Sequence, residues 1–280
     1  MPGTAPDVPD TAPHVVGAAR NGLDPDVARY LRALLGEARG VLGGDLVGAY
    51  AAGSVALGAY LPGRSDVDLA LVTASSLHVA VRERLVGRLR HESLPCPARG
   101  LELVVYTRDA AASGTPDPGF EVELNTGPRM PFRATLRPED RPAADGLFWY
   151  GLDRSILHAG GLALAGPPAA EVFADLAPGD LRTLLVASLR WWMALPTPPG
   201  DEPAPGADDA VLGAARALVR HRWGVWLPKA AAARRLTDQG HPAADLLARA
   251  VAARAGGPPP SGVEARAFQQ RVLDELDPRG

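Results

Sequence analysis

The stretch GSVALGAYLPGRSDVDLALV, residues 53–72, decides which fold this chain can adopt. It opens with the small turn Gly53-Ser54 and, after eleven intervening residues, reaches Asp66-Val67-Asp68. Apolar residues follow, so the acidic pair is predicted to begin a buried strand. Because alternate residues of a strand point to the same face, the carboxylates of Asp66 and Asp68 are expected side by side.

The surrounding residues predict a third carboxylate beside the first two. Strands are predicted over 46–52, 66–73 and 101–107, and a helix over 77–91 joins the last two of them. Glu102 lies near the start of the third strand, among apolar neighbours in LELVVYT. If these strands are neighbours in one sheet, three carboxylates gather next to the Gly-Ser turn.

These residue types suit the transfer of a nucleoside monophosphate from a triphosphate to a hydroxyl. Magnesium prefers one or two carboxylates together with substrate phosphates, which makes Asp66 and Asp68 candidate metal ligands. Gly53 allows the backbone to approach a phosphate closely, and Ser54 offers a hydroxyl at a helix start, where amides favour anions. Glu102 is the candidate general base that takes the proton of the hydroxyl.

A second candidate site for anions lies late in the chain. Lys229 is the only lysine of the sequence, and it follows Pro228 at the start of a predicted helix. A helix N-terminus with a lysine favours an anion. Arg216 lies 13 residues earlier, on the preceding predicted helix, and is expected to converge on the same anion.

Composition limits the classes of protein to which this chain can belong. The 280 residues are 46% hydrophobic and carry 29 basic against 32 acidic side chains, a net charge of −3. A nucleic-acid binder usually has a basic excess, so we expect no nucleic-acid partner. The single cysteine, Cys96, rules out an intramolecular disulfide, and no apolar run is long enough for a membrane span. We expect a soluble, cytoplasmic, monomeric protein with no membrane partner.

The pattern of helices and strands indicates an α+β fold in two domains. Residues 1–24 are proline-rich and predict a loosely attached arm. Residues 25–165 predict a small mixed sheet flanked by helices, in which 109–146 form loops around one short strand, 120–125. After the linker Gly166-Pro167-Pro168, residues 166–280 predict a bundle of helices that completes a cleft with the first domain.

The motif of residues 53–72 resembles the signature of the nucleotidyltransferase superfamily, in which Gly-Ser is followed by a spacer and Asp-x-Asp. Four further stretches resemble one branch, the aminoglycoside adenylyltransferases of the streptomycin/spectinomycin type. They are RGLELVVYT, FEVELNTGP, LALAGPPAAEVFADL and VLGAARALVRHRWGVWLPKAAAARRL. The resemblance covers roughly residues 28–255.

This resemblance implies that ATP and two magnesium ions bind between the domains and that AMP passes to an antibiotic hydroxyl. Asp66, Asp68 and Glu102 would then hold the metal ions, with Glu102 also the base. Gly53, Ser54 and Ser65 would line the nucleotide. Arg216 and Lys229 match the arginine and lysine that bind the phosphates.

Recognition of the acceptor is expected to use acidic and aromatic side chains, because aminoglycosides carry several ammonium groups. The resemblance brings Trp191 or Trp192, with Asp201 or Glu202, near the position of a drug-contacting tryptophan and aspartate. Acidic residues in segments that could border the cleft are Glu121, Glu123, Asp153, Asp201, Glu202, Asp208 and Asp209. Trp192, Asp201, Glu123 and Asp153 are our candidate substrate contacts.

Two alternatives to antibiotic modification remain open at the level of sequence. The same reaction could use another acceptor, such as a protein side chain, a nucleic-acid end or a metabolite. The chain could also be a silent nucleotide-binding module, although the presence of Asp66, Asp68 and Glu102 argues against that.

Overall fold

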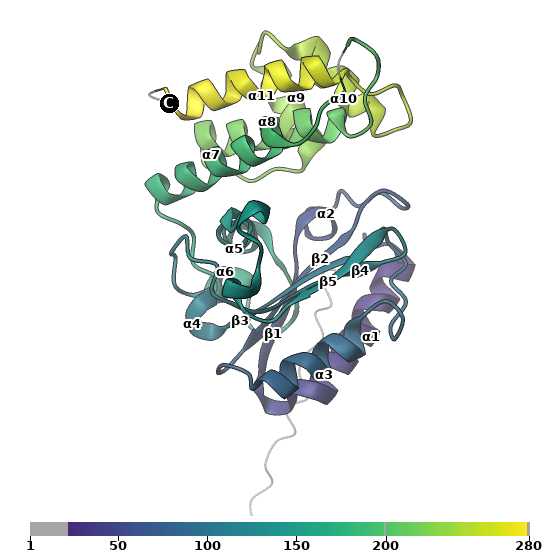
Figure 1. Cartoon of the computed structure of the whole chain (residues 1–280), viewed down its shortest axis with the longest axis vertical. Helices are drawn as coiled ribbons and strands as arrows, with labels where there is room; N and C mark the ends of the chain where they lie inside the picture. The colour runs from purple at the N-terminus through teal and green to yellow at the C-terminus, as the bar shows by residue number, and fades with distance from the viewer. Residues whose placement is uncertain (1–21, 199, 279–280) are drawn as a thin grey trace, which may run out of the picture.

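A computed structural model of the chain describes residues 22–198 and 200–278. It contains one sheet with helices on both faces and a group of helices above it (Figure 1). The arm predicted for residues 1–24 lies outside the described residues except for 22–24. None of the described helices is both long enough and apolar enough to cross a membrane.

The sheet has six strands in the order β5-β4-β3-β2-β1-β6. Their bounds are β1 Leu46–Ala51, β2 Val67–Thr73, β3 Leu101–Thr107, β4 Phe120–Gly127, β5 Met130–Thr135 and β6 Leu162–Ala165. Only β2 and β3 run parallel, and the remaining neighbours are antiparallel. The predicted helix between β2 and β3, α3 (Val79–Leu89), is the crossover that a parallel pair requires.

Two helices cover one face of the sheet. In α1 (Pro25–Leu42), Val27, Leu31 and Leu34 recur at helical spacing and are buried with α3 against the strands. The helix begins where it does because the Asp24 carboxylate accepts hydrogen bonds from the amides of Asp26 (2.9 Å) and Val27 (3.2 Å).

The other face carries α4 (Arg108–Ala111), α5 (Phe148–Gly160) and α6 (Ala169–Val172). Helix α5 has two apolar sides. Tyr150 and Leu157 pack with residues of the sheet, whereas Leu152 and Ile156 belong to the core of the upper helices. Helix α5 is therefore held between the two layers.

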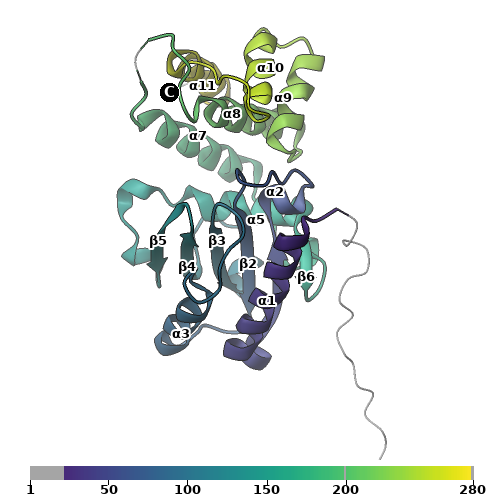
Figure 2. The same ribbon diagram turned by 90° about the vertical axis from the view of Figure 1, so that its right-hand side faces the viewer.

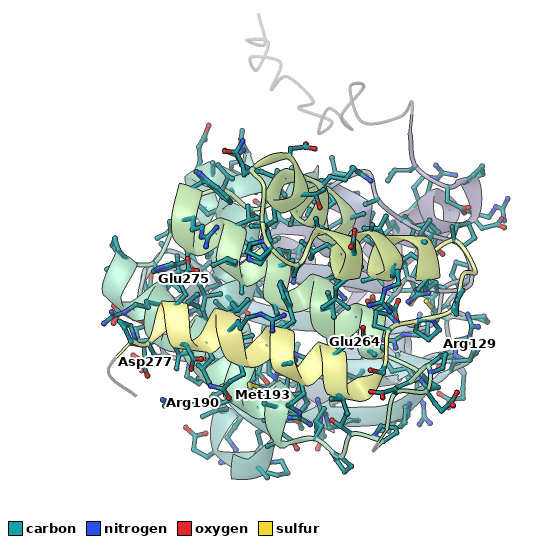
Figure 3. The ribbon with its side chains drawn as sticks, turned by 90° about the horizontal axis from the view of Figure 1, so that it is seen from above. Arg129, Arg190, Met193, Glu264, Glu275 and Asp277 are labelled. Atoms are coloured by element: carbon teal, nitrogen blue, oxygen red, sulfur yellow. The ribbon has the colours of Figure 1, made fainter. Side chains whose placement is uncertain are left out.

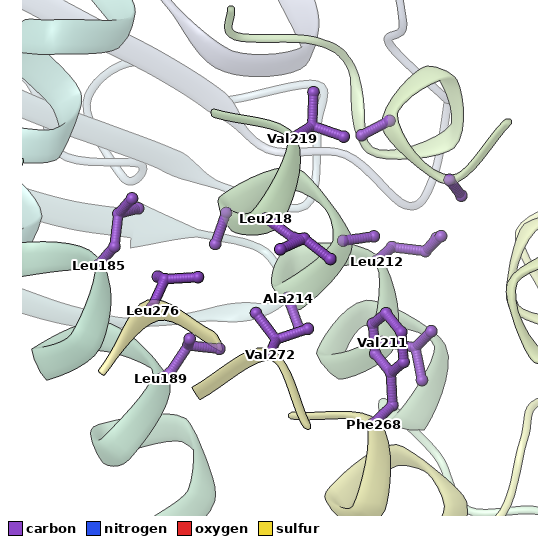
Figure 4. Close-up of a cluster of buried hydrophobic side chains, with 14 of the residues drawn as sticks. Leu185, Leu189, Val211, Leu212, Ala214, Leu218, Val219, Phe268, Val272 and Leu276 are labelled. Atoms are coloured by element: carbon purple, nitrogen blue, oxygen red, sulfur yellow. The ribbon is translucent and has the colours of Figure 1, made fainter. Parts of the chain in front are cut away.

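The upper layer consists of five helices, α7 Pro178–Ala194, α8 Ala207–Trp223, α9 Lys229–Asp238, α10 Ala244–Ala253 and α11 Gly262–Leu276. Figure 4 shows how their core forms from Leu185 and Leu189 of α7, Leu218 of α8, and Phe268 and Val272 of α11. Each of these side chains is at most 4% exposed, so the helical layer has an apolar core of its own.

The outer surface of the helical layer carries charged pairs. Seen from above in Figure 3, Glu264, Glu275 and Asp277 lie along α11. Arg190 of α7 donates to Asp277 at 2.8 Å, and Arg222 of α8 donates to Glu275 at 2.6 Å. Exposed pairs of this kind contribute little to stability, on the order of 0–1 kcal/mol.

The α+β prediction is confirmed, with a mixed sheet followed by helices, but the sheet is larger than expected. Residues 109–146 contain a hairpin, β4–β5, where one short strand was predicted, and β6 was not predicted at all. Both missed strands lie at the edges of the sheet, where sequence patterns are weak. The domain division at residue 166 stays a prediction, and α6, which follows it, packs against the sheet.

Candidate active site

Three carboxylates lie at one end of the parallel pair β2–β3. Asp68 stands directly opposite Glu102 in the register of the two strands, and Asp66 immediately precedes β2. The pKa of Asp68 is raised to about 7, first by burial and then by the charges of Asp66 and Asp153. Burial and the charge of Asp68 likewise raise the pKa of Glu102, although 45% of that side chain remains exposed. Two carboxylates this close repel each other and favour a cation between them.

The Gly-Ser turn lies against this pair. Gly53 has a positive φ of 54°, and a side chain at this position would collide with the carboxylate of Asp68. Ser54 is the second residue of the short helix α2 (Gly53–Ala56), and its hydroxyl is buried without a hydrogen-bond partner among the described residues. A buried hydroxyl without a partner is costly, so the turn is suited to a polar ligand.

We expect Gly53→Ala to remove magnesium-dependent nucleotide binding by displacing Asp68. Gly58→Ala is the matched control, because Gly58 has a similar φ of 63° but open space where a side chain would lie. Both variants carry the same backbone strain, about 1–2 kcal/mol. The thermal shift with Mg-ATP measures the difference, and equal shifts in both variants would show that Asp68 tolerates the added methyl group.

An arginine interrupts the expected carboxylate cluster. Arg99 donates to Asp66 at 2.6 Å and lies 4.0 Å from Glu102. In the described part of the chain, no three His, Cys, Asp or Glu side chains meet as a preformed metal site. The donors present are hard carboxylate oxygens, and Asp68 and Glu102 lie in register with raised pKa values, so the set fits magnesium.

Positive charge faces the carboxylates from the helical layer. A cavity of about 160 Å³ lies between α5, α7, α8 and the start of α9. Its polar and aromatic wall includes Trp149, Asp153, Trp192, Asp209, Arg216 and Lys229.

The two predicted phosphate-binding side chains differ in their partners. Arg216 makes no ion pair with any described residue, and its guanidinium lies 5.7 Å from the centre of the Trp226 ring. Lys229 donates to Asp209 at 2.9 Å. Both cations lower the pKa of Asp68, so the cationic wall and the carboxylate wall lie close to each other. Arg216 and Lys229 line the same cavity, and their convergence on one anion stays a prediction.

Asp153 of α5 lies near both the carboxylate of Asp68 and the guanidinium of Arg216. Burial raises its pKa to about 6, and the guanidinium groups of Arg216 and Arg154 oppose that rise. The charged form of a carboxyl group in such a position is favoured once a cation binds beside it.

We expect Asp153→Asn to flatten the pH dependence of stability. A carboxyl whose folded pKa lies above the ordinary 3.8 binds its proton more tightly in the folded state, so stability is lost as the pH rises from 3.8 to about 6. The loss amounts to at most about 3 kcal/mol. Urea unfolding of both proteins across this interval, without nucleotide, measures it. A difference between them that stays constant with pH would contradict the assignment.

Aromatic side chains form the rim of the cavity. Trp149, Trp191 and Trp192 stack edge to face, with ring centres 5.2–6.1 Å apart. The Trp191 indole donates to the carbonyl of Ala144 at 2.8 Å, which makes Trp191 a structural member. Trp192 is 40% exposed and lines the cavity, so of the two predicted tryptophans it is the one available to a ligand.

Two predicted acceptor contacts do not reach the cavity. Glu123 is only 6% exposed, and its oxygens accept hydrogen bonds from Arg133 (2.9 Å), Arg141 and Thr135 (3.1 Å). Asp201 is exposed in the loop between α7 and α8 and is not among the residues lining the cavity. Neither side chain lines the cavity, so the role of Glu123 and Asp201 at the acceptor stays a prediction that their placement does not support.

The remaining predicted nucleotide contact, Ser65, is buried. Its hydroxyl accepts a hydrogen bond from the amide of Leu61 at 3.0 Å and so closes the loop before β2. Its role at the nucleotide stays a prediction.

Four residues of the site were missed by the sequence reasoning. They are Arg64, Arg99, Trp149 and Arg254. Arg99 had one local signal, since it lies three residues before Glu102 on the way into β3. Arg64 and Arg254 had none, because the carboxylates with which they pair are distant in the chain.

Comparisons with known proteins bear on the fold. No family model matches this chain, and no curated protein sequence does. Among solved structures, a spectinomycin adenyltransferase from Enterococcus faecialis, crystallised with ATP and spectinomycin, matches with a TM-score of 0.64. The chain has the fold of an antibiotic adenyltransferase. The similarity covers 90% of this chain and 99% of the adenyltransferase, at 14% identity. The resemblance found in the sequence is thus confirmed at the level of the adenyltransferase fold.

Proposed function

We propose that this protein transfers AMP from Mg-ATP to a hydroxyl of a cationic aminocyclitol or aminoglycoside antibiotic. The observation that carries the proposal is the opposition of two charged walls. Asp68 and Glu102 lie on one side, and Arg216 and Lys229 lie on the other. A metal-bound triphosphate is the common ligand that satisfies both walls, because it presents cations to carboxylates and phosphates to arginine and lysine.

In the proposed reaction the acceptor oxygen attacks the α-phosphorus of ATP. A new oxygen–phosphorus bond forms, and the bond from the α-phosphorus to the oxygen bridging the α- and β-phosphates breaks. Glu102 takes the proton of the hydroxyl. Pyrophosphate leaves, and the charges of Arg216 and Lys229 stabilise it.

Asp66, Asp68 and Glu102 would hold magnesium, which would neutralise the triphosphate charge and align the reacting phosphate. Asp66 must exchange its Arg99 partner for the ion. Gly53 keeps the turn close to Asp68, and the unpartnered hydroxyl of Ser54 is available to a phosphate oxygen.

Asp153 and Trp192 are the acceptor contacts in this proposal. Asp153 has a raised pKa, so an ammonium group beside it would favour its charged form. The exposed face of Trp192 attracts a cation through its π-electrons. Trp149 also lines the cavity, and a second aromatic ring there is suited to a cationic acceptor. The spectinomycin bound by the structural neighbour is a small molecule of the class we propose.

The test is incubation of the protein with ATP, magnesium and a panel of aminoglycosides and aminocyclitols that includes spectinomycin. We expect pyrophosphate release and a drug mass increased by one AMP. Binding of Mg-ATP without any drug adduct would disprove the acceptor assignment. Absence of Mg-ATP binding would disprove the nucleotidyl transfer itself.

A further inference from the structure

One carboxylate of the cavity lining, Asp209, pairs with several cations. Asp209 lies in the first turn of α8, and its Oδ1 atom accepts from both Lys229 (2.9 Å) and Arg254 (2.8 Å). Arg64, from the loop before β2, lies 3.7 Å from its other oxygen and also pairs with the buried Asp208. Positive groups therefore outnumber the carboxylates that balance them.

Arg254 directly follows α10, and its ion pair with Asp209 holds it near Lys229 and Arg216. Its side chain is only 15% exposed. Burial lowers the pKa of Arg216, and the nearby charge of Arg254 lowers it further. Lys229 and Arg254 thus share one carboxylate oxygen of Asp209, and Arg216 lies near enough for the charges of Asp209 and Arg254 to act on it.

These cations have unused hydrogen-bond donors. A guanidinium carries five N–H donors, and Arg254 uses one of them, toward Asp209, with the described residues. Lys229 likewise makes one such bond, and Arg216 makes none. An anion with several acceptor oxygens would satisfy the spare donors and balance the excess charge.

We propose that Arg254 is a third cation for the terminal phosphates of ATP and that Asp209 positions it together with Lys229. This inference rests on the proposed function. It adds Arg254, which the sequence did not indicate, to Arg216 and Lys229. The consequence is a preference for nucleoside triphosphates over monophosphates, because Arg254 contacts phosphates that AMP lacks.

The experiment compares binding of Mg-ATP and of AMP, by calorimetry, to the wild type, Arg254→Gln and Arg249→Gln. Arg249 is the matched control, since it lies on α10 and pairs with Glu264 on the outer surface, away from the cavity (Figure 3 labels Glu264). We expect Arg254→Gln to weaken Mg-ATP binding about tenfold while the affinity for AMP stays the same, since one charge-assisted hydrogen bond is lost. Arg249→Gln should leave both affinities unchanged.

The outcomes separate this inference from the function on which it rests. If the wild type does not bind Mg-ATP, both fail. If Arg254→Gln binds Mg-ATP as the wild type does, or loses ATP and AMP affinity equally, only the role of Arg254 fails. Melting temperatures measured alongside identify a general loss of structure, and Arg254→Lys, which keeps the charge, should restore part of the ATP affinity.

Discussion

Glu102→Gln is expected to lower the turnover of AMP transfer by about 10²- to 10⁴-fold, the usual contribution of a general base. Glutamine keeps the shape and one carbonyl oxygen of the side chain but cannot accept the proton of the hydroxyl. Mg-ATP binding should weaken far less than turnover, because Asp66 and Asp68 still hold the metal and Arg216 and Lys229 still face the phosphates. The melting temperature should not fall, because burial and Asp68 already disfavour a charge at Glu102.

Glu121→Gln provides the control for this variant. Glu121 also lies on a neighbouring strand, but its carboxylate accepts from the amide of Leu77 at 2.8 Å and pairs with Arg82, away from the cavity. Turnover should stay within a few-fold of the wild type, as measured by pyrophosphate release at saturating ATP. A Glu102→Gln protein that retains more than about a tenth of the wild-type turnover would mean that another group accepts the proton.

Glu123→Ala is expected to lower the free energy of unfolding by about 3–5 kcal/mol, as for other buried ion pairs that lose one partner. The change leaves Arg141, which is 9% exposed, without its carboxylate, and Arg133 with only Asp145. Burial alone would raise the pKa of Glu123, but Arg141 and Arg133 outweigh it and hold that pKa below its usual value. The stabilisation is therefore complete above pH 4.5 and is lost as the pH falls below that value.

Urea unfolding measures this loss, with Glu139→Ala as the control. Glu139 follows β5, is exposed, and should change stability by less than about 0.5 kcal/mol. The folded fraction of Glu123→Ala should keep the acceptor KM of the wild type, because Glu123 does not line the cavity. An increased acceptor KM at unchanged stability would restore the substrate role that its sequence context suggested.

The strands that carry the carboxylates could be predicted because their pattern is local. The predicted third strand has the observed bounds, Leu101–Thr107, and Asp66 and Asp68 flank the start of β2 as alternation required. The helices of residues 166–280 were predicted as well, since turn residues and apolar periodicity mark them. Pro228 directly precedes α9, so Lys229 stands at the helix start as expected.

Which acidic residues line the cavity could not be predicted from local sequence in the same way. Asp153 and Glu123 were both predicted as acceptor contacts, yet one lines the cavity and the other pairs with two arginines. The difference depends on where Arg133 and Arg141 fold back, and nothing in the residues adjacent to Glu123 specifies this. The insertion of Arg99 beside Asp66 is also a tertiary contact, 33 residues apart in the chain.

From sequence alone come the carboxylate strands, the Gly-Ser turn, the helical second half and the lysine at the start of α9. All of these depend on residues within a few positions of each other, where backbone geometry and side-chain periodicity act directly. Only the tertiary structure decided which charges meet. Arg64 pairs with Asp208 across 144 residues, and Arg254 pairs with Asp209 across 45. Such pairs form because burial between two packed layers removes water and forces charges to find partners, and local sequence does not specify which partners those are.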